Sequence, residues 1–411
     1  MNRMSTAGGY ELPYIRRGTR AYRRAFWGLL LGGLSTFNLL YCVQPLMPIF
    51  SRHFAVGADA TALSLSLTTA MLALAMLGAA PLADRFGRKP MMLASLLASS
   101  LLVLAGSLLD NWLALLATRA LLGLSLAGLP AIAMTYLAEE IEPAALNAAM
   151  GVYIGGNALG GVIARLMNGA VADLFSWRAA LAMSGLLGLL GSLIIWRILP
   201  RSRVFVPVRH RDPQAGGAYR RHLRNPFLLL LLVEGALLSG ILVTTCNLLG
   251  YRLVAAPFHM SVALTSLIFV SYLLGAPTTI FAGRLAGKIG RSRILMGGLA
   301  LILAGTGLMT VERLPAIAAG LGLLATGFFA AHSSASALIS VGADQAKAQA
   351  ASLYLFSFYA GSGVISWFGG HVWIWGQWPA VTAYLVLLTL VGFASAARLG
   401  SLIGRVASSK G

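Results

Sequence analysis

Two similar octets recur about half a chain length apart in this sequence: Leu82-Ala83-Asp84-Arg85-Phe86-Gly87-Arg88-Lys89 and Leu285-Ala286-Gly287-Lys288-Ile289-Gly290-Arg291-Ser292. Each octet is a short, basic, glycine-containing break between two long apolar runs. A repeat at this spacing indicates that the 411-residue chain consists of two related halves. We therefore expect the same helical unit to occur twice in the fold.

The rest of the chain is unusually apolar. Hydrophobic residues make up 58% of the chain, charged residues make up only 10%, and the mean hydropathy is +0.80. Ordinary soluble domains carry roughly 25% charged residues. One core of this length cannot hide such a surplus of apolar side chains, so lipid is expected to surround most of the chain. The composition therefore excludes an ordinary soluble enzyme.

The apolar residues fall into twelve runs of roughly 20 residues, each long enough to cross a bilayer as a helix. The strands of a membrane barrel would instead alternate between apolar and polar residues. The sequence therefore predicts an all-α membrane protein with both termini on one side. The runs are expected to begin near Phe26, Thr61, Pro90, Trp112, Asn147, Ala179, Pro226, Val262, Ile294, Pro315, Gln349 and Gln377.

Basic residues give the orientation of these helices. Most of the 31 Lys and Arg residues lie in the two tails, the two octet loops and a central segment rich in proline and glycine. The positive-inside rule therefore predicts that both termini and the central segment are cytoplasmic. No removable signal peptide is visible before the first apolar run. The expected parts are a tail (1–25), a six-helix bundle (26–198), a basic linker (199–225), a second six-helix bundle (226–400) and a tail (401–411).

The formal net charge of +19 does not indicate nucleic-acid binding, because the basic residues form no cluster on a soluble module with aromatic side chains. Cys42 and Cys246 both lie in apolar runs and are interpreted as small buried hydrophobes. The sequence contains no HExxH, CxxC, GxSxG or phosphate-binding-loop motif, and its six histidines are scattered. We expect no enzymatic activity, no cofactor and no metal site.

The stretch from Pro81 to Lys89 resembles the signature loop of the major facilitator superfamily, although Ala80 stands where the family pattern has a glycine. The resemblance implies twelve transmembrane helices in two six-helix bundles, and a secondary transporter. Arg119 with Gly123 and Gly128 resembles the helix-four motif of proton-coupled members. A glycine-rich stretch resembles the antiporter motif, with close helix packing as the competing interpretation; its members are Gly151, Gly155, Gly156, Gly160 and Gly161.

Four further phrases, scattered over both halves, resemble the YnfM-like subgroup that is placed with the drug:proton antiporters. They begin at Tyr41, Met134, Gly250 and Phe328. This resemblance implies export in exchange for protons but does not fix a substrate.

Glu234 is the only one of the twelve acidic residues that lies within an apolar run, about 12 Å into its expected helix at 1.5 Å per residue. A charged side chain in hydrocarbon costs several kcal/mol of free energy, so such residues are usually paired with another group or serve a function. We therefore expect Glu234 to exchange a proton during function. The alternative is a structural acid that is hydrogen-bonded to a neighbouring helix.

Arg119 and His332 complete the expected proton-coupling set. Arg119 stays charged and would act electrostatically, unless it forms only a packing ion pair. His332 can shuttle a proton or can be a satisfied interhelical histidine. Arg165 is expected to snorkel or to pair with Asp173. The expected substrate cavity is lined by polar and aromatic residues, namely Asn38, Tyr41, Gln44, Asn157, Asn247, Tyr251, Tyr354 and Phe358.

The charges of the first octet predict a conformational latch, because they can pair with acids in a neighbouring loop and break apart in another state. The alternative is a static surface cluster. The expected latch residues are Asp84, Arg85, Gly87, Arg88 and Lys89 with Glu139 and Glu140, and Glu142 is a third candidate acid.

The sequence thus favours a monomeric carrier of the bacterial inner membrane that exports a small organic molecule in exchange for protons. Its expected partners are that molecule, protons and the lipid bilayer. A proton symporter that imports a sugar or organic acid is the alternative, and a non-transporting membrane sensor is a third reading.

Overall fold

The computed structural model describes residues 14–202, 215–275, 277–343 and 345–408. The start of the expected N-terminal tail, the middle of the expected linker and the last three residues lie outside the described residues. Within the described part the chain is almost entirely helical, and the β-structure there is an isolated bridge between Ile15 and Ile141.

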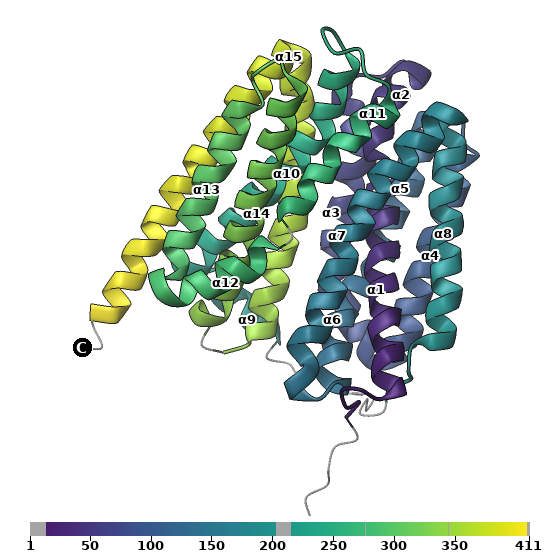
Figure 1. Ribbon diagram of the computed structural model, residues 1–411. Helices are drawn as coiled ribbons and strands as arrows, with labels where there is room; N and C mark the ends of the chain where they lie inside the picture. The colour runs from purple at the N-terminus through teal and green to yellow at the C-terminus, as the bar shows by residue number, and fades with distance from the viewer. Residues whose placement is uncertain (1–13, 203–214, 276, 344, 409–411) are drawn as a thin grey trace, which may run out of the picture.

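The first half of the chain forms the bundle on the right of Figure 1. Two of its helices are broken: α1 continues through a 3₁₀ turn into α2, and α5 is offset from α6 at Ala127. The elements are α1 (Arg20–Tyr41), η1 (Gln44–Leu46), α2 (Met47–Phe54), α3 (Ala58–Phe86), α4 (Arg88–Ser107), α5 (Trp112–Leu126), α6 (Gly128–Glu140), α7 (Pro143–Leu174) and α8 (Trp177–Ile198).

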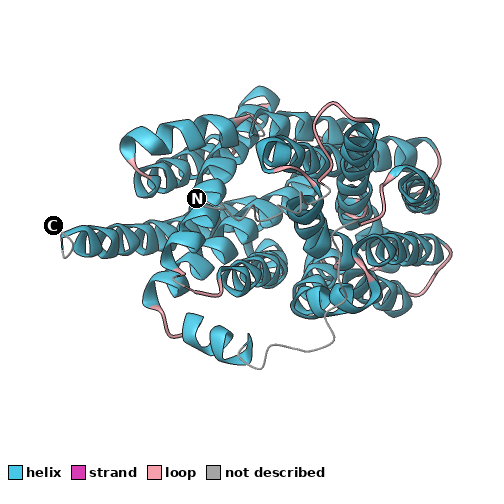
Figure 2. Ribbon diagram, turned by 90° about the horizontal axis from the view of Figure 1, so that it is seen from below, coloured by secondary structure: helices cyan, strands magenta, loops and turns pink. Residues whose placement is uncertain are grey.

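The second half forms the bundle on the left of Figure 1, and Figure 2 shows the molecule from below, with the helix that ends at the C-terminus inclined away from the rest. A non-helical kink at Gly376 and Gln377 divides α15 into two helices. The elements are α9 (Ala215–His222), α10 (Pro226–Val254), α11 (Val262–Leu267), η2 (Ile268–Gly275), α12 (Thr278–Ile289), α13 (Arg291–Leu308), α14 (Leu314–Gly342) and α15 (Lys347–Ser408).

The expected count of twelve membrane-crossing helices agrees with these elements. Ten helical stretches of the described chain are long and apolar enough to cross a bilayer. The last stretch contains the kink of α15 and counts twice, and α13 adds a further helix of 18 residues. The all-α fold with six crossing helices in each half is thus confirmed.

Polar capping residues explain where several helices begin. Thr19, Asn111, Ser176, Asn225 and Ser261 each accept a hydrogen bond from a backbone N–H in the first turn of the following helix. Such caps satisfy donors that have no partner inside the helix. The Thr19 cap places the start of α1 six residues before the expected position. The sequence did not indicate this start, because the first turn of α1 is basic and adds nothing to the apolar run.

Other boundaries also differ from the expected parts. Helix α9 lies within the segment that was expected to be only a linker, and α15 continues to Ser408, beyond the expected end of the bundle at residue 400. Helix α9 is short and carries Arg220, Arg221 and His222 in its last turn, so a search for long apolar runs does not detect it.

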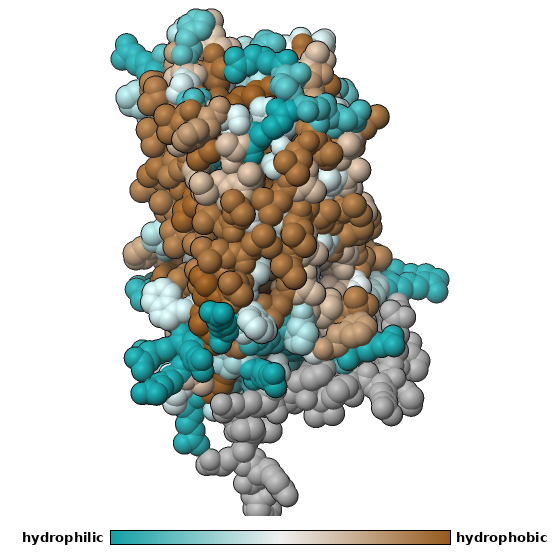
Figure 3. Space-filling view, turned by 90° about the vertical axis from the view of Figure 1, so that its right-hand side faces the viewer, coloured by the Kyte–Doolittle hydropathy of each residue, from teal (hydrophilic) through white to brown (hydrophobic). Residues whose placement is uncertain are grey.

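Each half packs around its own apolar core, and many large apolar side chains on the outside stay exposed. Figure 3 shows one face, on which a hydrophobic belt lies between two hydrophilic ends. We call the end with the start of α1, both octet loops and the end of α15 the basic end. We call the opposite end, with α2 and the loop 255–261, the far end (Figure 1).

Candidate functional site

Glu234 is fully buried inside the second bundle, on α10. Among the described residues neither of its carboxylate oxygens has a hydrogen-bond partner. A Cβ atom added to Gly392 would lie 3.8 Å from Oε2, so the carboxyl group faces the second part of α15. The nearby Ser395 hydroxyl donates to the Leu230 main-chain oxygen. The acid is therefore enclosed within one bundle and does not lie between the two halves.

A chain of aromatic side chains connects Glu234 to the surface where the halves meet. Tyr354 lies within electrostatic range of Glu234, and its hydroxyl is 2.9 Å from His332 Nδ1. The His332 ring lies 4.8 Å from the ring of Phe358. Phe358 contacts the apolar cores of both halves. The structure thus brings four of the predicted residues together in one cluster.

Arg119 lies apart from this cluster, in the first half. Its guanidinium donates from Nε to the Ser64 oxygen at 2.8 Å and from Nη2 to the Leu40 oxygen at 2.9 Å. Nη1 adds a longer contact to the Leu39 oxygen, 3.4 Å away. These last carbonyls of α1 have no partner within the helix and carry its negative dipole end. Arg119 therefore stabilises the break after α1 in the first half, whereas Glu234 lies in the second half.

Three predicted cavity residues join the two halves near the far end. Gln44 Nε2 donates to Asn247 Oδ1 at 2.6 Å, and Asn247 Nδ2 donates to Ser366 Oγ at 2.7 Å. The Tyr251 hydroxyl donates to the Met47 oxygen at 3.0 Å and also bonds the Thr61 hydroxyl. These residues form a polar bridge between α10 and the first half.

Two further contacts across the halves were not predicted. The Asp173 carboxylate accepts from the backbone N–H groups of Val262 and Ala263 at 3.3 and 2.8 Å, so it caps α11. Asp59 lies 3.5 Å from His371 Nε2. An acid at a loop edge carries no sequence signal for such partners. Together with the polar bridge, we call these contacts the far-end clamp.

Arg165 is buried at the boundary between the halves, not at the membrane surface. Its guanidinium lies 4.8 Å from the centre of the Tyr41 ring, 5.2 Å from that of Phe269 and 5.7 Å from that of Tyr272. Such cation–π contacts stabilise a desolvated arginine. The expected pairing with Asp173 is not formed among the described residues, because Asp173 caps α11.

Ion pairs among the predicted latch residues form around one arginine, and their release in another state stays a prediction. Arg88 Nη1 donates to Asp84 Oδ1 at 2.6 Å, and Nε and Nη2 donate to the two oxygens of Glu139 at 3.1 and 2.8 Å. These bonds connect α3, α4 and α6. Arg85 lies instead over the Phe86 ring, and Lys89 donates to the Trp196 oxygen at 2.7 Å.

The two other candidate acids lie at the N-terminal segment. The main-chain oxygen of Glu140 accepts from the Ile15 N–H at 2.7 Å. Glu142 Oε1 accepts from the Arg17 N–H at 2.6 Å. The segment before α1 is thereby attached to the end of α6.

The remaining cavity candidates pack within the first half. Asn38 Nδ2 donates to the Ser184 oxygen at 3.3 Å, and Asn157 lies against Gly33 of α1. Cβ atoms added to Gly156 and Gly160 would approach α1 oxygens to 2.4 and 2.3 Å. Part of the glycine-rich stretch therefore serves close helix packing.

Comparisons with known proteins agree with this architecture. The family model of the Major Facilitator Superfamily matches residues 29–252. The inner membrane transport protein YnfM of Escherichia coli K12 is 42% identical over 94% of this chain and 93% of its own. The multidrug resistance protein MdtG of Yersinia enterocolitica is 27% identical over 68% of this chain and 69% of its own.

A solved structure has the same fold. It is a bacterial homologue of the human lysosomal transporter Spinster in an inward-facing and occupied conformation, with a TM-score of 0.73 at 18% identity. The match covers 94% of this chain and 98% of that chain. The chain therefore belongs to the major facilitator superfamily and is a multi-pass membrane transporter, not an enzyme.

Proposed function

We propose that this transporter exports a small organic molecule, such as a drug, in exchange for protons. It would do so from a bacterial-type inner membrane, with the basic end and both termini in the cytoplasm. The cluster of positive charge at the basic end supports this orientation. The similarity to a relative named for multidrug resistance supports the substrate class.

The observation that carries the proposal is the environment of Glu234. An ionised carboxylate without hydrogen-bond partners costs several kcal/mol in an apolar interior. A change of protonation at Glu234 therefore requires a change in its surroundings. Tyr354 and His332 provide polar atoms between this acid and the boundary of the halves. Protonation and movement of the halves are coupled if the acid reaches water in only one of the two states.

The contacts between the halves support alternating access. The far-end clamp joins the halves on the outer side in the proposed orientation, and Arg165 adds cation–π contacts between them. The ion pairs around Arg88 lie within the first half and join α3, α4 and α6, so in this proposal they act as the static alternative to a latch and keep these helices together as one moving body. Opening of the protein at the far end then requires the far-end clamp to break.

The test uses proteoliposomes that contain a pH-sensitive dye and either the wild-type protein or the Glu234→Gln variant. A panel of cationic drugs, sugars and dicarboxylates is added, and proton movement is recorded. With the wild-type protein, we expect protons to cross the membrane in the direction opposite to the substrate. Glu234→Gln, which keeps the side-chain shape, should abolish that movement, whereas the exposed loop variant Glu312→Gln should not change it.

The pH dependence of substrate binding gives a second measurement. Because proton and substrate compete in an exchanger, wild-type affinity should fall as pH falls, by at most about tenfold per pH unit for one proton. The affinity of Glu234→Gln should not depend on pH. If the affinity of Glu234→Gln depends on pH in the same way as that of the wild type, the role of Glu234 is contradicted. Proton movement with the substrate indicates the importing symporter, and binding without flux indicates a sensor.

A further inference from the structure

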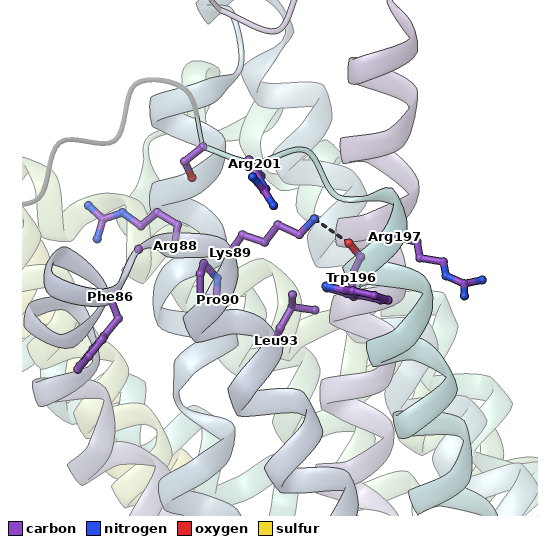
Figure 4. Close-up of a pocket in the computed structure, with 10 residues that line it drawn as sticks. Phe86, Arg88, Lys89, Pro90, Leu93, Trp196, Arg197 and Arg201 are labelled. Carbon is purple, nitrogen blue, oxygen red and sulfur yellow. Dashed lines mark hydrogen bonds between the residues drawn. The ribbon is translucent and has the colours of Figure 1, made fainter.

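A pocket of about 790 Å³ opens at the basic end of the first half, away from the boundary between the halves. It lies between the start of α4 and the end of α8, as Figure 4 shows. Its apolar wall includes Phe86, Pro90, Leu93 and Trp196. The Trp196 side chain is 58% exposed, which is typical of a tryptophan at the membrane surface.

Cations line the polar side of this pocket. Lys89 and Arg201 both line it and lie within electrostatic range of each other, and Figure 4 shows the Lys89 ammonium reaching the Trp196 main-chain oxygen. Lys89 also lies within electrostatic range of Arg24. The described residues supply no carboxylate to these three groups. The positive charges of Lys89, Arg201 and Arg24 repel one another, and an anion bound between them relieves that repulsion.

Donors for such an anion remain available. The Lys89 ammonium has three N–H donors, and it gives bonds to the main-chain oxygens of Trp196 and Leu199. One donor is left for a ligand. The Arg201 guanidinium has five donors in a planar arrangement that matches the oxygens of a phosphate. The polar side of the pocket therefore fits a phosphate group.

Apolar surface continues from the pocket along both helices toward the hydrocarbon. Leu97 and Leu101 follow Leu93 at four-residue intervals on the same face of α4, and both are about half exposed. On α8 a similar exposed face leads to Trp196 and consists of Leu186, Leu190 and Leu193. Acyl chains can pack along these faces while a headgroup occupies the pocket.

We propose that this pocket binds an anionic phospholipid, with its phosphate between Lys89 and Arg201 and its acyl chains along α4 and α8. Basic pockets between helices on the cytoplasmic side commonly bind anionic headgroups. Because Lys89 directly follows the latch residue Arg88, the bound lipid holds the start of α4 in place. This site does not depend on the direction of transport or on the substrate.

The test titrates the full-length protein in neutral detergent with phosphatidylglycerol or phosphatidylcholine and counts bound lipids by native mass spectrometry. Phosphatidylglycerol should bind saturably and more tightly than phosphatidylcholine. Arg201→Gln should weaken its binding by roughly fivefold, the effect of about one basic residue at an anionic surface. The control Arg284→Gln removes an exposed arginine at the basic end of the other half and should not change the affinity.

Competition with inorganic phosphate separates the two sources of the anion. Millimolar phosphate should displace little lipid, because it lacks the acyl chains. Full displacement by phosphate would identify the site as one for a soluble anion and contradict the lipid assignment. Equal losses in Arg201→Gln and Arg284→Gln, or equal binding of both lipids, would overturn the proposal. Melting temperatures in lipid-free detergent establish that both variants are folded.

Discussion

The two octet loops have the same backbone but different chemistry. Gly87 has φ 92° and ψ 152°, and Gly290 has φ 91° and ψ 148°. Each glycine ends one helix and caps the next, from α3 to α4 and from α12 to α13. A left-handed φ with this ψ is accessible almost only to glycine. The turn is therefore determined locally, and both halves retain it.

The charge network differs between the loops. In the first loop Arg88 bonds Asp84 and Glu139, whereas Gly287 occupies the position of Asp84 in the second loop. The equivalent arginine, Arg291, is exposed, and the described residues give it no ion pair. The latch thus needs acids at defined positions, one of them on a distant helix, and the shared backbone turn does not create it. The predictions below test this difference, from the largest effect to the smallest.

Replacing the arginine should affect the two loops very differently. Arg88→Ala removes three charge-assisted hydrogen bonds, and we expect the free energy of unfolding to fall by about 2 kcal/mol after allowing for partly exposed acids. Arg291→Ala should leave stability unchanged. Thermal unfolding in the same detergent measures both variants. Similar losses of stability in the two variants would show that the arginines act through the overall charge of the loops and not through specific ion pairs.

Replacing the glycine should affect the two loops alike. Gly87→Ala and Gly290→Ala each place a Cβ atom on a left-handed backbone, and each should cost about 1 to 2 kcal/mol of stability. Thermal unfolding again provides the measurement, with Gly283→Ala as a control because its helix leaves open space for a methyl group. A large loss in only one loop would contradict a shared turn requirement.

Neutralising the acid of the first loop should have a smaller effect. Asp84→Asn keeps the size of the side chain but removes one charge from the bond to Arg88, so stability should fall by about 0.5 kcal/mol. High salt should reduce the difference from the wild type, because this pair is partly exposed. The result to be compared is the shift in melting temperature at low and high salt. A shift that salt leaves unchanged would argue against an electrostatic origin.

Introducing the missing acid into the second loop should have the smallest effect. Gly287→Asp creates an acid four residues before Arg291, as in the first loop, and should stabilise the protein by about 0.3 kcal/mol. Gly287→Asn is the matched uncharged control. A gain for Asp over Asn at low salt would show that the second loop can accept the first loop's local pair. Equal stability of the two variants would rule that out.

Much of the architecture was predictable along the chain. The twelve apolar runs begin within six residues of the observed helices, and the octet repeat correctly divides the chain into two halves. Among site residues, Arg88 bonds Glu139, one of the acids expected from the neighbouring loop. Its second partner, Asp84, belongs to its own octet and was not predicted as a partner. His332 and Tyr354 were separate candidates in the sequence, and only the packing of α14 against α15 brings them into contact.

Other partnerships were not predictable. Arg119 and Glu234 are both buried charges, yet they lie in different bundles, and Arg119 donates to the carbonyl oxygens of Ser64 on α3 and of Leu40 at the end of α1. Arg165 meets aromatic rings from both halves instead of Asp173. Backbone carbonyls and aromatic faces occur throughout the sequence, so no spacing rule identifies which of them a buried arginine will contact.

The sequence by itself determined the membrane setting, the number of helices, the two halves and the family. It could do so because a helix in hydrocarbon must satisfy its own backbone and present a continuous apolar run, which is a property of consecutive residues. Only the tertiary structure decided the cluster of Glu234, Tyr354 and His332, the far-end clamp and the basic pocket between α4 and α8. Those features depend on how helices distant in sequence rotate and pack, and the apolar pattern of a helix buried on all sides does not encode its rotation.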